Sequence, residues 1–267
     1  MTTVKANGID IAYRIDGSGD PLILIGGFTM VKESWGLQVA DLAKRFRVIT
    51  FDNRGVGGST APAEPFTIAD MAADTIGLMD ALDIPSAHFF GVSMGGLIAQ
   101  VLALDYPDRV RKAALGCTTH GGKHAVQPEK EVMAILGKAA DPGIPPEESL
   151  RMRLPIIMSE GFRQDHPRRV EAFVSDGLRH MPTAQGAKGQ MGALSRFNVR
   201  DRLGKITCPV LVITGSEDRM MPPENADLLT DGISGAELVV IEGAGHSFFF
   251  EKPEEVNRVL IDFFLEA

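Results

Sequence analysis

Three residues of this 267-residue chain have side chains of the kinds that nucleophilic catalysis requires, and each follows a short apolar run. Ser93 lies in Gly91-Val92-Ser93-Met94-Gly95, and His246 lies in GAGHS. A serine hydroxyl becomes a strong nucleophile when a base takes its proton. A carboxylate on the other imidazole nitrogen then orients the base and stabilises its cationic form. We therefore predict Ser93 as nucleophile, His246 as base and an acid in GSEDRMMPP, where Asp218 and Glu217 compete.

The glycines around Ser93 indicate a sharp turn from a strand into a helix. Glycines two positions before and after the serine remove the Cβ atoms that would collide in such a turn. The serine is held in a strained conformation, with its hydroxyl at the amino end of a helix that begins near Met94. A plain Gly/Ser turn is the alternative, but the flanking strand and helix favour a nucleophile.

The tetrahedral intermediate of acyl transfer needs two donors directed at its oxyanion. The backbone amide of Met94, the residue after the nucleophile, is one candidate. The second is Phe28 in Gly26-Gly27-Phe28, which follows an apolar strand; the glycines leave room for a carbonyl oxygen.

The elements that position these residues follow from short runs rich in Val, Ile, Leu and Phe, separated by helix-length segments. We predict eight strands, at residues 3–7, 9–14, 21–25, 47–51, 87–91, 110–116, 209–214 and 237–241. Asn7-Gly8 is a favourable hairpin turn between the first two strands, and the later strands are expected to be parallel. Helices are expected at about 33–44, 67–82, 94–105, 223–230 and 253–265.

Parallel strands place their following loops at one edge of the sheet, so Ser93, the acid and His246 are expected to meet there. Between residues 118 and 207 no strand is convincing, and helix-like pieces occur at about 130–140, 147–158, 167–179 and 183–194. Such a segment is too long for a loop. We predict a core domain of residues 1–118 and 207–267 and a helical cap subdomain of residues 119–206.

The composition excludes several classes of function. A net charge of −8 argues against nucleic acid or an anionic membrane as partner. No apolar stretch is long enough for a membrane span or a secretory signal, so we expect a cytoplasmic protein. Cys117 and Cys208 fall at opposite ends of adjacent strands, which predicts free thiols.

Together the GGF loop, the DNRGVGGS loop, the GVSMGG turn, the GSEDRMMPP loop and the GAGHSFFFEKPEEV segment resemble the α/β-hydrolase fold superfamily over the whole chain. The chain is similar to its serine carboxylesterases, enol-lactonases and perhydrolase or haloperoxidase-type esterases. The resemblance implies an α/β fold with an eight-stranded, mostly parallel sheet and flanking helices, and it favours Asp218 over Glu217. Serine at position 93 argues against haloalkane dehalogenases and epoxide hydrolases, whose nucleophile is aspartate.

The chain departs from these relatives in one loop. They usually carry His-Gly before the oxyanion residue, whereas this chain has Gly26-Gly27, which affects the rigidity of the loop more than activity. Asp52 and Arg54 resemble loop-ordering residues of the family and are not counted as catalytic.

The expected reaction is hydrolysis of a small to medium, largely apolar carboxylic ester or lactone through an acyl-enzyme, without metal or cofactor. The small-molecule substrate is the expected partner, and a homo-oligomer is left open. Three alternatives use the same triad: a C–C bond hydrolase of a diketone, a cofactor-free perhydrolase and a low-turnover ligand receptor.

The walls of the substrate pocket are expected to come from apolar residues of the rim and the cap, namely Met30, Trp35, Met158, Met181, Met220 and Phe248.

Overall fold

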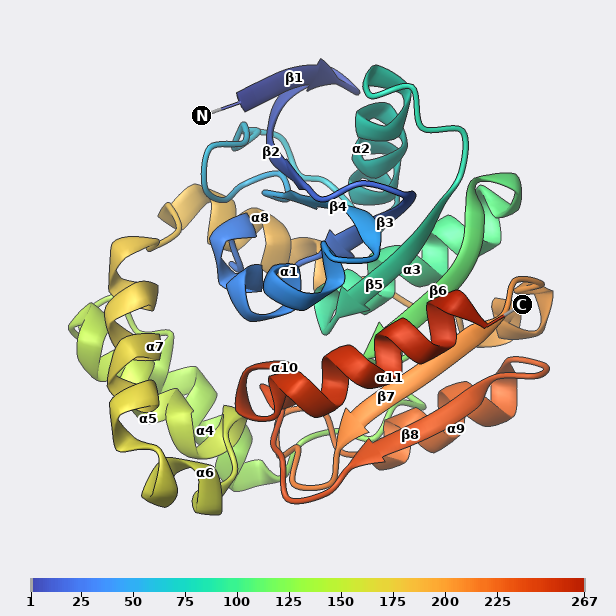
Figure 1. Cartoon of the computed structure of the whole chain (residues 1–267). Coiled ribbons are helices and arrows are strands. Elements are labelled where there is room, and N and C mark those ends of the chain that lie inside the picture. Colours follow the sequence, from blue (N-terminus) through green and yellow to red (C-terminus); the bar gives the residue numbers. More distant parts are fainter. Residues whose placement is uncertain (1, 267) are drawn as a thin grey trace.

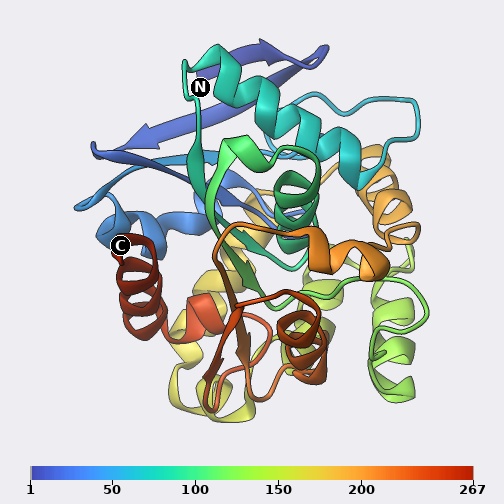
Figure 2. The same ribbon diagram turned by 90° about the vertical axis from the view of Figure 1, so that its right-hand side faces the viewer.

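The computed structural model describes residues 2–266, which form one sheet with helices on both of its faces (Figures 1 and 2). The eight strands are ordered β1-β2-β4-β3-β5-β6-β7-β8. They are β1 (Thr2–Ala6), β2 (Ile9–Asp16), β3 (Asp20–Ile25), β4 (Phe46–Phe51), β5 (Ala87–Val92), β6 (Val110–Gly116), β7 (Val210–Gly215) and β8 (Glu237–Ile241). The predicted eight-stranded α/β fold is confirmed.

The strand directions also follow the prediction. β1 and β2 form an antiparallel hairpin, and β2 pairs antiparallel with β4. Every further pair, from β4 with β3 to β7 with β8, is parallel. Asn7 and Gly8 have φ angles of 47° and 79° at the hairpin, as a tight turn with two left-handed residues requires.

Both faces of the central strands are buried, which explains their continuous apolar runs. In β3, Ile23 and Ile25 join the apolar cluster under one layer of helices, whereas Leu22 and Leu24 join the cluster under the other. The first layer contains α2 (Ile68–Ala81), α3 (Met94–Asp105) and α9 (Glu224–Gly232). The second contains α1 (Gly36–Leu42), α10 (Phe248–Glu251) and α11 (Pro253–Leu265).

The segment between β6 and β7 is helical, as expected. It contains α4 (Lys130–Ala139), α5 (Pro146–Ile157), α6 (Glu160–Asp165), α7 (Pro167–Arg179) and α8 (Ala184–Leu194). Helices α4 to α7 form a lobe beside the sheet (Figure 1). Within it, Leu154, Phe162 and Val174 belong to a small apolar cluster separate from the main core. The boundaries of the cap at 119 and 206 stay a prediction.

Helix α8 packs against the core instead of joining this lobe. A Cβ on Gly186 would lie 1.7 Å from the carbonyl oxygen of Gly55, so helix and loop meet backbone to backbone. Arg196, just after α8, donates to the carbonyl of Phe66 at 2.9 Å. The cap segment is thus tied to the core at α8.

Short elements differ most from the sequence-based expectation. The helix expected at 33–44 is a 3-10 helix over Lys32–Trp35 followed by α1. The sequence does not predict α6 and α10, which have six and four residues. Helices of this length contain too few turns to show an apolar period.

Candidate active site

Ser93 occupies the sharp turn between β5 and α3. Its φ of 53° and ψ of −116° lie in a region that residues with a side chain rarely adopt. A Cβ on Gly91 would lie 2.2 Å from the carbonyl oxygen of Gly95, and one on Gly95 would lie 2.0 Å from that of Ile25. Only glycine fits at these two positions, because each lies directly against backbone.

The serine is the accessible residue of this turn. From residue 87 to residue 103 every residue except Ser93 is buried. The turn is tied to β6, because the Ser93 amide donates to the carbonyl of Gly116 at 2.8 Å and the Thr118 hydroxyl donates to the carbonyl of Ser93 at 2.8 Å. The hydroxyl is therefore presented by a rigid support.

His246 and Asp218 form the pair that a serine nucleophile requires. Nδ1 of His246 lies 2.7 Å from Oδ2 of Asp218. The other carboxylate oxygen accepts the amides of Met220 at 2.9 Å and Met221 at 2.7 Å. Donation from Nδ1 leaves Nε2 as the basic nitrogen. Glu217 is exposed, so the carboxylate in contact with His246 is that of Asp218.

Cys117 lies between the turn and this pair. Its Sγ, a carboxylate oxygen of Asp218 and a ring nitrogen of His246 all lie within 4.8 Å of one another. Burial, with the Asp218 carboxylate beside it, raises the pKa of the Cys117 thiol well above its usual value, and the Ser93 backbone adjoins the same thiol. A raised pKa disfavours the thiolate, so Cys117 is a poor nucleophile here.

The two candidate oxyanion donors belong to segments that adjoin Ser93. A Cβ on Gly27 would lie 3.9 Å from Oγ of Ser93, which places the Gly26-Gly27-Phe28 loop against the serine. Within residues 2–266, neither the Phe28 amide nor the Met94 amide donates to a protein acceptor. Two backbone donors in segments that adjoin Ser93 are thus unused among the described residues, as is expected of an oxyanion hole.

Residues outside the Gly26-Gly27-Phe28 loop hold it in place. Asn53 donates from its side chain to the carbonyl of Gly26 at 3.0 Å. The side-chain oxygen of Gln190 accepts the amide of Thr29 at 2.8 Å. These contacts order the loop around Gly26 and Gly27.

Asp52 and Arg54 make the contacts of loop-ordering residues. The buried Asp52 carboxylate accepts the backbone amides of Lys32 at 2.7 Å and Gly58 at 2.8 Å. Arg54 forms a buried ion pair with Asp74 at 2.5 Å. Neither side chain contacts Ser93 or His246 among the interactions of the described chain.

The loop that carries His246 is fastened to the cap by Glu251, a buried carboxylate. Its Oε1 accepts the Gly245 amide at 3.0 Å, and its Oε2 accepts the Ser159 hydroxyl at 2.6 Å and the Ser159 amide at 3.2 Å. The Ser247 amide donates to the carbonyl of Ile157 at 2.7 Å. Burial raises the pKa of Glu251. The residues on both sides of His246 are therefore held by the α5–α6 connection.

The predicted pocket residues fall in different places. Trp35 and Phe248 are fully buried in the core, where Trp35 packs at centroid distances of 5.4 Å from Phe90 and 5.5 Å from Phe249. Met30 packs against the same core cluster, while Met158 belongs to the cap cluster. Met181 is 44% exposed after α7, and Met220 donates its amide to Asp218. Their role in a pocket stays a prediction.

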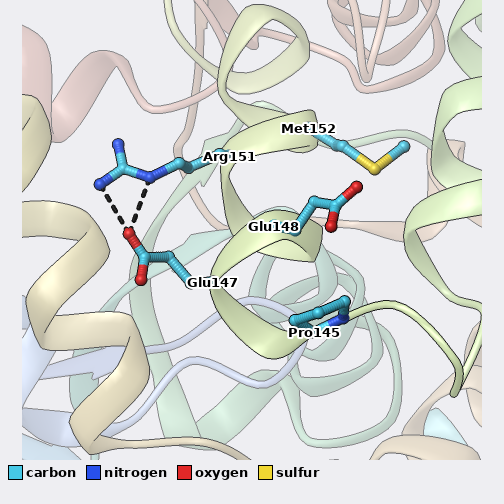
Figure 3. A pocket seen from close by; sticks show the side chains of 5 residues that line it. All are labelled: Pro145, Glu147, Glu148, Arg151 and Met152. Atoms are coloured by element: carbon cyan, nitrogen blue, oxygen red, sulfur yellow. Dashed lines mark hydrogen bonds and ion pairs between the residues drawn. The ribbon is translucent and has the colours of Figure 1, made fainter.

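Two cavities adjoin the cap. One has a volume of about 380 Å³ and includes the candidate acid Asp218 in its wall. Its lining residues are Pro155, Met158, Ser159, Glu160, Arg163, Ser216, Glu217, Asp218 and Arg219. The other, shown in Figure 3, lies on α5 around Pro145, Glu148 and Met152, beside the Glu147–Arg151 ion pair. None of Ser93, Asp218 and His246 lines the cavity on α5.

Glu251 and Gln190 are the contributors to this site that sequence reasoning does not find. Glu251 interrupts an apolar run, FFFEKP, and a lone charge in such a run is a weak signal of a buried, paired carboxylate. Gln190 lies in a helix of small and polar residues, and nothing local distinguishes it from a solvent-exposed glutamine.

Comparison with known proteins shows the family of the chain. Residues 20–253 match the family model described as alpha/beta hydrolase fold. The chain therefore belongs to the α/β-hydrolase fold family, and its relatives support a hydrolase activity.

Three relatives illustrate the similarity. The chain is 35% identical over 260 residues to "Putative non-heme bromoperoxidase BpoC" of Mycobacterium tuberculosis (strain ATCC 25618 / H37Rv), covering 96% of this chain and 98% of that protein. It is 30% identical over 262 residues to 3-oxoadipate enol-lactonase 2 of Acinetobacter baylyi, covering 97% and 94%. The crystal structure of the enol-lactonase from Burkholderia xenovorans LB400 matches with a TM-score of 0.86 at 30% identity, covering 99% and 100%.

Within residues 2–266, none of the helices is both long enough and apolar enough to cross a bilayer.

Proposed function

We propose that this protein is a serine hydrolase that cleaves a small to medium, largely apolar carboxylic ester or lactone through an acyl-enzyme. The observation that carries the proposal is the buried His246–Asp218 hydrogen bond of 2.7 Å, which Cys117 links to the strained Ser93 turn. A histidine whose Nδ1 donates to a buried carboxylate is the kind of base that activation of a serine hydroxyl needs.

The proposed reaction has two half-reactions. His246 Nε2 takes the proton of Ser93 as Oγ bonds to the substrate carbonyl carbon, and the amides of Phe28 and Met94 stabilise the oxyanion. The carbon–oxygen bond to the alcohol then breaks, and the alcohol leaves with the proton from His246. Water repeats these steps on the acyl-enzyme, which releases the acid and restores Ser93. In a lactone the alcohol stays attached to the acyl group.

The proposal predicts which substitutions abolish activity. In a panel of p-nitrophenyl esters and simple lactones, Ser93→Ala and His246→Ala are each expected to lower kcat/KM by roughly a thousandfold or more. Glu217→Gln is the matched control, because this neighbouring acid is exposed, and its activity is expected to stay within about twofold of wild type. Full activity in Ser93→Ala would overturn the proposal.

A cofactor-free perhydrolase is a second candidate, favoured by the 35% identity to a relative whose name is a non-heme bromoperoxidase. In that reaction hydrogen peroxide takes the place of water on the acyl-enzyme and releases a peracid. Incubation with acetate and peroxide, followed by a peracid-dependent bromination assay, separates the two. Peracid formation that depends on Ser93 supports the second candidate, and ester hydrolysis without it supports the first.

A further inference from the structure

Helix α8 inserts a fully buried glutamine between two loops of the core. Gln190 is 0% exposed. Its Oε1 accepts the Thr29 amide at 2.8 Å, and its Nε2 donates to the carbonyl of Arg54 at 3.0 Å. One planar side-chain amide therefore satisfies a donor and an acceptor of two different backbone segments.

The residue that Gln190 holds has an unfavourable conformation. Thr29 has a φ of 58°, and a β-branched residue rarely adopts the left-handed region. Thr29 is the third residue of a turn that closes where the Met30 amide donates to the carbonyl of Gly27 at 3.2 Å. Rotation of the peptide between Phe28 and Thr29 would relieve the strained φ, but it would break the hydrogen bond to Gln190.

These bonds fix Phe28 from both sides. The Gly27 carbonyl belongs to the peptide group that contains the Phe28 amide, and Met30 holds it. The Thr29 amide belongs to the next peptide group, and Gln190 holds that one. Both backbone dihedral angles of Phe28 are thus restrained, and the second restraint comes from the cap segment.

We propose that Gln190 is a positioning residue of the oxyanion hole, acting through Thr29 on the Phe28 amide. This inference rests on the proposed serine hydrolase function. Oxyanion donors are effective when they are already in place, because no free energy is then spent on orienting them during the reaction. Gln190 is therefore expected to matter for the transition state and little for substrate binding.

Steady-state kinetics and a transition-state analogue test this role. With p-nitrophenyl butyrate, Gln190→Met is expected to lower kcat by about tenfold to a hundredfold while KM changes by less than about twofold, because the donor is misplaced rather than removed. Butylboronic acid forms a tetrahedral adduct with a nucleophilic serine, and its inhibition constant is expected to rise by a similar factor. A kcat loss with unchanged boronic acid inhibition would overturn the proposal.

Two further substitutions separate positioning from packing. Gln190→Glu keeps an acceptor for the Thr29 amide, so it is expected to retain more activity than Gln190→Met. Gln190→Asn keeps a polar amide, but its side chain is too short to reach Thr29. We therefore expect its kcat to fall and its boronic acid inhibition constant to rise, as in Gln190→Met. If Gln190→Met does not fold, Gln190→Asn provides the test, and wild-type kinetics in Gln190→Asn would overturn the proposal.

Gln185→Met is the matched control on the same helix. Gln185 is exposed and also donates to a core carbonyl, that of Ala61, at 3.1 Å, but it does not reach the Phe28 loop. Its kcat and boronic acid inhibition are expected to match wild type, and an equal loss in Gln185→Met would overturn the role of Gln190. A failure of the proposed function would be distinct, because Ser93→Ala would then hydrolyse the ester as fast as wild type.

Discussion

At the scale of single residues, the candidate site depends on positions where no side chain fits. The strained φ of 53° at Ser93 is possible because Gly91 and Gly95 let β5 and α3 approach backbone to backbone. Burial of the neighbouring Cys117 raises the pKa of its thiol. The Ser93 turn therefore depends on missing side chains at its glycines as much as on contacts.

Gly95→Ala tests this dependence. The new Cβ would lie 2.0 Å from the carbonyl oxygen of Ile25, so the strand and the helix must separate. We expect the free energy of unfolding to fall by about 3 kcal/mol or more, with loss of esterase activity.

Gly137→Ala is the control, because a Cβ at this exposed position of α4 meets nothing within 4 Å. It is expected to raise stability by about 0.5–1 kcal/mol. Thermal denaturation of both variants checks the prediction, and equal melting temperatures would contradict it.

At the scale of elements, loops after β3, β5, β7 and β8 gather at one edge of the sheet, as parallel strands require. The cap segment then holds two of these loops, through Gln190 at the oxyanion loop and through Glu251 and Ser159 at the histidine loop. The insertion after β6 thus supports the proposed catalytic geometry, besides any part it has in binding substrate.

Glu251→Gln tests the second of these supports. Both carboxylate oxygens accept from donors, so a side-chain amide must turn its NH₂ group toward one of them. We expect kcat to fall by about tenfold and the protein to lose about 1–3 kcal/mol of stability. Glu254→Gln, at an exposed acid on α11, is expected to change neither. Kinetics and denaturant unfolding of the two variants check this, and identical values would show that the histidine loop does not need Glu251.

Much of the element scale follows from the sequence, and the reason is local. All eight strands are recognisable, though for different reasons. Strands β3 to β7 are short apolar runs that are largely buried, and β8 is an apolar run at the edge of the sheet. The more exposed β1 and β2 are marked by the Asn7-Gly8 turn between them. Ser93 stands out in the sequence because Gly91 and Gly95 flank it, and such glycines indicate that two backbone segments approach closely. Gln190 and Glu251 do not stand out, because their partners are far away in the sequence. Gln190 bonds to the backbone of Thr29, and Glu251 bonds to Ser159. No local sequence pattern indicates such a contact. For the same reason, sequence alone does not predict that Trp35 is fully buried beside Phe90 and Phe249.

At the scale of the whole molecule, a buried histidine makes stability depend on pH. Burial, together with the Arg111 charge, lowers the pKa of His88 from 6.5 to about 4, and its ring packs against Phe46 and Phe264. Because the pKa is lower in the folded state, the stabilisation is complete above pH 6.5 and is lost as the pH falls toward 4.

His88→Phe tests this dependence. Wild type is expected to lose about 3 kcal/mol of unfolding free energy between pH 6.5 and 4 through this residue, and His88→Phe is expected to lose correspondingly less. His124, an exposed histidine, supplies the control variant His124→Phe, which is expected to follow wild type. Urea unfolding at several pH values checks the slope, and parallel curves for wild type and His88→Phe would contradict the assignment.

The most direct test of the proposed mechanism is to label the protein with a fluorophosphonate, which reacts with serines activated by a histidine, and to locate the adduct by peptide mass spectrometry. The account predicts one adduct per chain, on the peptide that contains Ser93, and labelling slowed by roughly a thousandfold in His246→Ala. An adduct on a different serine, or labelling of Ser93 at the same rate without His246, would contradict it.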